Sequence, residues 1–220
     1  MAGKAGPNVV KDGLVLNVDA ANPKSYPGSG TTWYDLSGNG YSGNLTNGPT
    51  FSTANNGIIE FDGVNDVCTL TSNFSGFTGI TVNVFYYSNT SSSTALTRAV
   101  GSAYILHFRG AGFYIIDSNG SASGYLRWDT RPTEENWRML TGTWDGTTMK
   151  LYQNGVKQST ERSFTGTGIL RTFTSIQLAY YFNSSQPQTN GDISYFQIYD
   201  RALTSDEILQ NYNATKSRFK

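Results

Sequence analysis

Cysteine and histidine are nearly absent from this sequence of 220 residues, which holds only Cys68 and His107. One cysteine excludes an intrachain disulfide and a cysteine-based zinc site. One histidine means that any Ser-His-Asp triad would have to use His107, which we interpret instead as an ordinary strand residue. We expect Cys68 to be a small buried hydrophobic residue.

Net charge and long apolar runs are also missing. The 16 Lys and Arg residues balance the 16 Asp and Glu residues, so the chain lacks the broad positive field that binding to phosphate backbones requires. No stretch approaches the roughly 18 apolar residues of a membrane span, and the first residues lack the apolar region of a secretory signal. We therefore expect no nucleic-acid partner, no membrane partner and no export signal.

Residues that favour turns and strands are abundant instead. Gly, Ser, Thr and Asn make up 92 of the 220 residues, which excludes a helical bundle. Short alternating runs separated by turn residues predict an all-β fold, a two-sheet antiparallel β-sandwich. The predicted strands are Leu14 to Val18, Ile58 to Phe61, Val67 to Leu70, Ile80 to Tyr87, Tyr104 to Phe108, Phe113 to Ile116, Tyr125 to Trp128, Arg138 to Trp144, Met149 to Gln153, Val156 to Ser159, Ser175 to Ala179 and Ile193 to Tyr199.

The ends of the chain have a different character. One short C-terminal helix is predicted from Ser205 to Tyr212, because Thr204 and Glu207 have the spacing of a capping box. We expect residues 1–13 to be an N-terminal extension, 14–213 to be the sandwich domain and 214–220 to be a basic, solvated tail. Residues 20–53 are rich in Pro and Gly and are expected to form a long surface loop.

A pair of catalytic carboxylates is not evident. Sandwich glycosidases usually place their acids as Glu-x-Asp-x-x-Glu on one strand. Here that strand reads Glu60-Phe-Asp62-Gly-Val-Asn65, so Asn65 stands where the second acid is needed. We therefore expect no catalytic residues and no enzyme activity.

Calcium is the one metal that the composition allows, because it takes oxygen ligands from Asp, Asn and backbone carbonyls in loops. The candidate ligands are Asp35 and Asn39 in one loop, and Asp62 and Asp66 in another. Asx turns explain the same residues without any metal. A structural calcium ion is accordingly an open alternative, and no other cofactor is required.

Aromatic residues next to loops are the main indication of a ligand. Sugars stack on exposed aromatic rings beside Asn, Asp and Gln side chains, and the sequence places Trp128, Tyr180 and Tyr181 next to loops. We predict that these three residues form a glycan-binding platform. The alternative is that they belong to the core, which needs bulky inward residues.

Three segments together resemble the concanavalin A-like, laminin G-type jelly-roll family. Residues 33–40 read Trp-Tyr-Asp-Leu-Ser-Gly-Asn-Gly, and residues 59–66 read Ile-Glu-Phe-Asp-Gly-Val-Asn-Asp. The third segment runs from Trp137 through the turn at Asn154 to Ile208. The last strand departs from the family pattern, because it reads Gly191-Asp-Ile-Ser-Tyr195 where Gly-x-Ile-Asp-Glu is usual. The resemblance implies a concanavalin A-like sandwich and leaves any role of that Asp-Glu pair in doubt.

The segment from Asp19 to Trp33 and the ending from Asn211 to Phe219 are similar to laminin G-type domains of tailed-bacteriophage virion proteins. This resemblance implies a non-enzymatic virion component, either a capsid decoration or part of a fibre or appendage. It would be assembled in the host cytoplasm, contact other virion proteins, form homo-oligomers and bind host or environmental glycans. The alternative is a soluble carbohydrate-binding protein that acts on polysaccharide.

Overall fold

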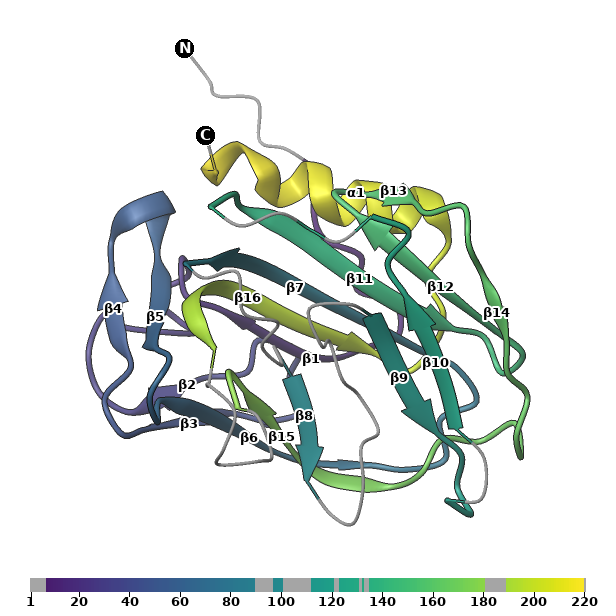
Figure 1. Cartoon of the computed structure of the whole chain (residues 1–220). Helices are drawn as coiled ribbons and strands as arrows, with labels where there is room; N and C mark the ends of the chain where they lie inside the picture. Colours follow the sequence, from purple (N-terminus) through teal and green to yellow (C-terminus); the bar gives the residue numbers. More distant parts are fainter. Residues whose placement is uncertain are drawn as a thin grey trace.

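The computed structural model describes residues 7–89, 97–100, 112–120, 123–130, 132, 135–180 and 189–219. These residues form an antiparallel β-sandwich with one short C-terminal helix, as the sequence predicted (Figure 1). The predicted strand from Tyr104 to Phe108, with His107, lies outside the described residues. None of the described helices is long and apolar enough to cross a membrane.

The larger sheet has nine strands, and β16 pairs with β7, β5 and β1. Two strands share one edge of β16, because β5 pairs with its first half and β1 pairs with its second half. In order across the sheet the strands are β13 (Val156–Lys157), β12 (Thr148–Gln153), β11 (Arg138–Trp144), β7 (Ile80–Ser88), β16 (Asn190–Tyr199), β5 (Ile58–Asp62) and β4 (Thr50–Ser52), with β1 (Leu14–Asp19) on β16 and β14 (Arg162–Ser163) on β12.

The second sheet faces the first across the core. Its strands in order are β2 (Thr32–Trp33), β3 (Gly43–Thr46), β6 (Val67–Phe74), β15 (Phe173–Leu178) and β8 (Thr97–Val100), and a separate hairpin consists of β9 (Gly112–Ile116) and β10 (Ser123–Arg127). Side chains alternate along each strand, so every second residue enters the main core. Trp33, Trp144, Phe113, Phe173 and Phe196 are almost fully buried there.

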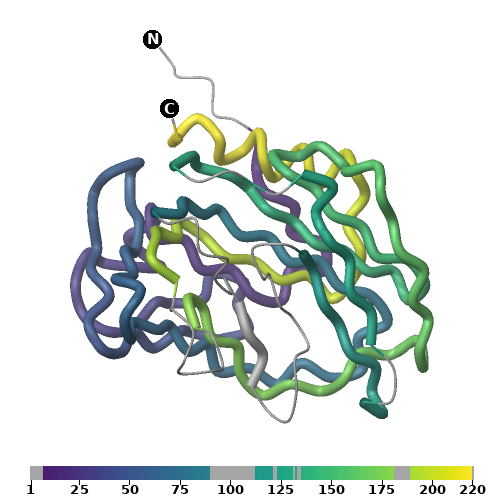
Figure 2. Tube along the Cα trace, viewed as in Figure 1, coloured from purple at the N-terminus to yellow at the C-terminus, as the bar shows by residue number. Residues whose placement is uncertain are grey.

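The outer face of the larger sheet carries a second apolar cluster. Phe85, Tyr195 and Tyr199 point away from the main core and are covered by Ile208 of α1 (Ser205–Thr215). In Figure 2 the yellow C-terminal segment runs along the green strands of this sheet. The helix begins at Thr204 with the predicted capping box, which confirms that part of the sequence analysis.

The C-terminal tail differs from the expected solvated segment. The tail is docked, because Phe219 stacks on Phe85 with ring centroids 4.0 Å apart and Arg218 forms a two-bond ion pair with Asp19. The N-terminal extension is also anchored, since the Tyr199 hydroxyl donates to the Val10 carbonyl over 3.0 Å. The end of the tail therefore packs on the sandwich, whereas Lys216 and Ser217 are exposed.

The expected surface loop from 20 to 53 is partly strand. It contains β2, β3 and β4, which are too short to give an alternating pattern in the sequence. Their pairing partners β6 and β5 lie later in the chain, so the local sequence alone does not show them. The short helical turn η1 (Ala54–Asn56) then leads into β5.

Candidate functional site: an acidic pocket beside β5 and β16

The register of three antiparallel strands gathers polar side chains on the outer face of the larger sheet. Glu60 of β5 lies directly opposite Asp192 of β16 on one side and Thr50 of β4 on the other. Ile59 and Phe61 enter the main core, so Glu60 and Asp62 point outward by the two-residue period of a strand. Glu60 and Asp62 do not belong to the second apolar cluster on this outer face. They line a pocket instead.

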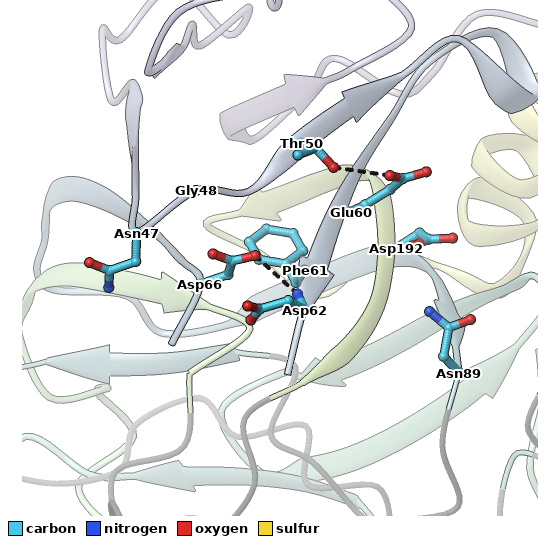
Figure 3. Close-up of a pocket in the computed structure, with 9 residues that line it drawn as sticks. All are labelled: Asn47, Gly48, Thr50, Glu60, Phe61, Asp62, Asp66, Asn89 and Asp192. Carbon is cyan, nitrogen blue, oxygen red and sulfur yellow. Dashed lines mark hydrogen bonds between the residues drawn. The ribbon is translucent and has the colours of Figure 1, made fainter. Parts of the chain in front are cut away.

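The pocket has a volume of about 460 Å³, within the range of small-molecule sites. Four of its lining side chains are carboxylates, and none of the described residues that line it is basic. The lining residues, drawn in Figure 3, are Asn47, Gly48, Thr50, Glu60, Phe61, Asp62, Asp66, Asn89 and Asp192.

Glu60 and Asp192 form a pair of like charges across neighbouring strands. Burial raises the pKa of Asp192 to about 6, and the facing charge of Glu60 adds to the rise. The Thr50 hydroxyl donates to Glu60 Oε2 over 3.0 Å and holds that carboxylate in place. Facing like charges destabilise a sheet, so this pair is a cost to folding that a ligand could offset.

Asp66 is the most buried carboxylate of the pocket, with 4% of its surface exposed. Its Oδ2 accepts the backbone N–H of Asp62 over 3.0 Å, whereas its Oδ1 is buried without a hydrogen-bond partner. Burial raises the pKa of Asp66, the charge of Asp62 adds to the rise, and the hydrogen bond from Asp62 N–H opposes it. Buried polar atoms are nearly always hydrogen-bonded, so this oxygen is an unused acceptor.

Two amides hold the neighbouring loops in place. Asn47 Nδ2 donates to the Asn65 carbonyl over 2.7 Å, and Asn89 Nδ2 donates to Asn190 Oδ1 over 3.1 Å. Asn47 and Gly48 both have positive φ, at 70° and 115°, which makes the tight turn between β3 and β4. The pocket is therefore bordered by hydrogen-bonded loops on a sheet, a rigid support for a ligand.

The candidate calcium ligands separate into two groups. Asp62 and Asp66 line the pocket, whereas Asp35 and Asn39 do not. The Asp35 carboxylate already accepts four hydrogen bonds, two from Ser37 and one each from the backbone N–H groups of Asn17 and Tyr41. In the described part of the chain, no three Asp, Glu, His or Cys side chains come together as a metal site. Turn chemistry explains Asp35, and calcium binding stays a prediction.

The predicted glycan platform is wrong at Trp128. This side chain is only 8% exposed and belongs to the main core. Strand alternation is the reason, since Leu126 and Trp128 share the inward side while Tyr125 and Arg127 lie on the other side. Tyr180 is half-buried, and Tyr181 lies outside the described residues.

The sequence analysis missed the role of Asp192 and did not consider Tyr87. Tyr87 lies opposite Asp192 in the sheet, on the outer face, and its ring centroid is 5.6 Å from that of Trp137. The useful signal was the alternation of Glu60 with Ile59 and Phe61, which already placed one acid on the outer face. Its partner could be found only from the register of β16.

Comparison with known proteins agrees with this architecture. Residues 61–209 match the family model of the concanavalin A-like lectin/glucanases superfamily. The chain belongs to this superfamily. A search of curated protein sequences finds no match. The superfamily includes both lectins and glucanases, so membership alone leaves the activity open.

Three solved structures illustrate how far this superfamily fold is shared. The binding domain of botulinum neurotoxin DC, solved with rat synaptotagmin II, has a TM-score of 0.73 at 14% identity and covers 94% of this chain and 52% of its own. The serotype D ligand-binding domain, solved with N-acetylneuraminic acid, has a TM-score of 0.71 at 15% identity and covers 92% and 51%. The binding domain of paraclostridial mosquitocidal protein 1 has a TM-score of 0.68 at 19% identity and covers 93% and 52%.

This chain therefore spans about half the length of the solved structures that it matches. At such low identity the likeness shows the fold alone. Within the superfamily, the chain shares the jelly-roll architecture of these binding domains.

Proposed function

We propose that this chain is a lectin-like, non-enzymatic binding domain that recognises a glycan through the acidic pocket. The observation that carries the proposal is the convergence of Glu60, Asp192 and Asp66 on one pocket of a lectin-superfamily fold. Sugar hydroxyls donate hydrogen bonds, and ionised carboxylates are strong acceptors for them. Tyr87, which pairs with Asp192 in the sheet, is an aromatic side chain on the same face on which a sugar ring could stack.

The charge of the pocket selects among glycans. Four carboxylates without a basic neighbour in the described lining repel a ligand that carries its own carboxylate. We therefore expect a neutral or basic sugar, in contrast to the acidic sugar seen with the neurotoxin serotype D domain. The absence of catalysis is proposed from the sequence, because Asn65 replaces the second acid of the one-strand glycosidase motif.

The sequence resemblance suggests which larger assembly carries this domain. We propose that the domain is carried on a bacteriophage particle, as a capsid decoration or as part of a fibre or appendage, in contact with other virion proteins and as a homo-oligomer. Mass spectrometry of purified particles tests the setting, and particles free of this chain would overturn it. The soluble polysaccharide-binding protein is then the remaining alternative.

A glycan array tests the binding activity. We expect the wild-type chain to bind neutral or basic glycans and Asp192→Asn to bind them at least about tenfold more weakly, because a charge-assisted acceptor is lost. Glu161→Gln is the matched control, since it also removes one negative charge. Glu161 is exposed and lies between β13 and β14, near the edge of the larger sheet opposite to β4 and β5. Loss of binding in both variants, or binding by neither the variants nor the wild type, would contradict the proposal. Glycan turnover that Glu60→Gln abolishes would replace binding with hydrolysis.

A further inference from the structure

Asp66 Oδ1 is the starting observation, because it is a buried acceptor without a donor. Figure 3 shows the other oxygen of this carboxylate bonded to the Asp62 backbone, while Oδ1 points toward Asn47 and Gly48. A donor that comes from a ligand would satisfy this atom.

The surrounding charges specify which donor fits. Glu60, Asp62 and Asp192 line the same pocket as Asp66. The ion pairs in the described part of the chain lie elsewhere, and none of them neutralises these four carboxylates. A positively charged donor gains from every one of these charges, whereas a neutral hydroxyl gains mainly from the carboxylate that it contacts.

The shape of the site favours an organic cation over a bare metal ion. The described residues bring no three acidic, His or Cys side chains close enough for metal coordination, and the pocket of about 460 Å³ is far larger than an ion needs. A primary ammonium has three N–H donors. Amide, hydroxyl and carboxylate oxygens can each accept one of these hydrogen bonds. Asn47, Thr50 and Asn89 supply such oxygens around the carboxylates.

Gly48 lines the pocket beside Asp66. A Cβ at this position would lie 3.8 Å from Asp66 Oδ1, in the space between the β3–β4 turn and the carboxylate. Glycine also meets the positive φ of 115° that the turn requires. Any other residue here would therefore place its Cβ in van der Waals contact with the unused acceptor.

We propose that the acidic pocket binds a sugar that carries a protonated amine, with the ammonium group donating to Asp66 Oδ1 and the sugar hydroxyls donating to Glu60 and Asp192. This inference rests on the proposed glycan-binding function and names its ligand class as amino sugars that are not N-acetylated. Because N-acetylation removes the charge and leaves one amide N–H, the acetylated sugar is the natural negative control.

Isothermal titration calorimetry with a glucosamine trisaccharide, its fully N-acetylated counterpart and 1,4-diaminobutane tests this inference at about pH 7, where ordinary carboxylates are ionised. We expect the amine trisaccharide to bind at least about tenfold more tightly than the acetylated one, since one charge-assisted bond is lost on acetylation. Asp66→Asn, which keeps the shape of the side chain, should remove this preference. Asp206→Asn, an exposed substitution in the first turn of α1, should keep it.

The outcomes separate this inference from the proposed function. Equal affinity for the two trisaccharides, or a preference that survives in Asp66→Asn with an unchanged melting temperature, overturns the amine inference and leaves glycan binding in place. Binding of the diamine alone, lost in Asp66→Asn, supports the amine site and overturns glycan binding. Binding of none of the three ligands overturns both. A calcium titration that displaces the bound amine sugar in the wild type but finds no site in Asp66→Asn would reassign the pocket to a metal ion.

Discussion

Glu60 and Asp192 face each other directly in the antiparallel register of β5 and β16, with no basic residue of the described pocket lining between or beside them. Few sheets place two acids in facing positions, because the repulsion and the burial of charge both oppose folding. The arrangement is consistent with a site selected for a ligand at some cost in stability. That cost is measurable.

Asp192→Asn should stabilise the unliganded protein at neutral pH. The pKa of Asp192 in the folded state, about 6, lies above the ordinary 3.8, so the folded state binds the proton more tightly than the unfolded state does. The free energy of unfolding therefore falls as the pH rises from about 4 to above 6. We expect the variant to gain about 1 to 2 kcal/mol at about pH 7.5 and to lose this advantage below about pH 4.

Urea denaturation across this pH range measures the effect, with Asp206→Asn as the control that should show no such trend. If Asp192→Asn were less stable than the wild type at neutral pH, the Asp192 carboxylate would have a favourable partner that outweighs its repulsion from Glu60.

The C-terminal helix should depend on its capping box. Thr204 Oγ1 accepts the Glu207 N–H, and Glu207 Oε2 accepts the Thr204 N–H over 2.8 Å. We expect Thr204→Ala to cost about 0.5 to 2 kcal/mol and to lower the melting temperature. Unchanged melting of both Thr204→Ala and Ile208→Ala would show that the helix is not docked on the sheet.

Glu207 should also make the protein sensitive to acid. Two hydrogen bonds from Arg201 lower the pKa of Glu207 to about 2, from an ordinary 4.5. Because the folded pKa is lower than the unfolded one, this contribution is present above about pH 4.5 and is lost as the pH falls toward 2. Glu207→Gln should flatten that part of the curve of stability against pH, and an unaltered curve would contradict the assignment.

Trp128 and Tyr125 should respond differently to truncation. Trp128→Ala removes a core side chain and should cost about 3 to 5 kcal/mol, whereas Tyr125→Ala, at a half-buried position, should cost about 1 kcal/mol or less. Chemical denaturation of both variants measures the difference. Equal costs would contradict the placement of Trp128 in the core.

Asp35 should act through its loop and independently of calcium. Asp35→Ala removes the acceptor of four hydrogen bonds and should cost about 1 to 3 kcal/mol. We expect the change from chelator to calcium to shift the melting temperature of the wild-type protein and of Asp35→Ala by the same amount. A melting temperature that rises with calcium in the wild type, and not in Asp35→Ala, would restore the metal site that the sequence left open.

The fold was predictable from the sequence because its signals are local. The alternation from Arg138 to Trp144 and the spacing of Thr204 and Glu207 each determine a nearby structure, and both predictions are confirmed. The short strands β2, β3 and β4 were missed because two to four residues give no period. The docked ends were missed because the contact between Arg218 and Asp19 joins opposite ends of the chain.

The candidate site was harder to predict for the same reason. Glu60 and Asp62 drew attention as an incomplete catalytic motif, whereas Asp192 entered only as a departure from a family pattern. Their meeting depends on the register of strands far apart in the sequence, which a period of two does not fix. Trp128 was wrongly expected to be exposed. Side chains alternate between the two faces of a strand, so an aromatic residue at the end of a strand faces the core or the solvent according to its position in this alternation.

Backbone amide chemical shifts of the isotopically labelled protein, recorded during titration with the glucosamine trisaccharide, test the central claim most directly. We predict that the largest shift changes fall on the residues of the acidic pocket, at Gly48, Glu60, Asp66 and Asp192, and that Asp66→Asn needs about tenfold more sugar to reach them. Shift changes confined to Tyr125, Arg127 or Tyr180, or no changes anywhere at saturating sugar, would contradict the claim that this pocket is the binding site.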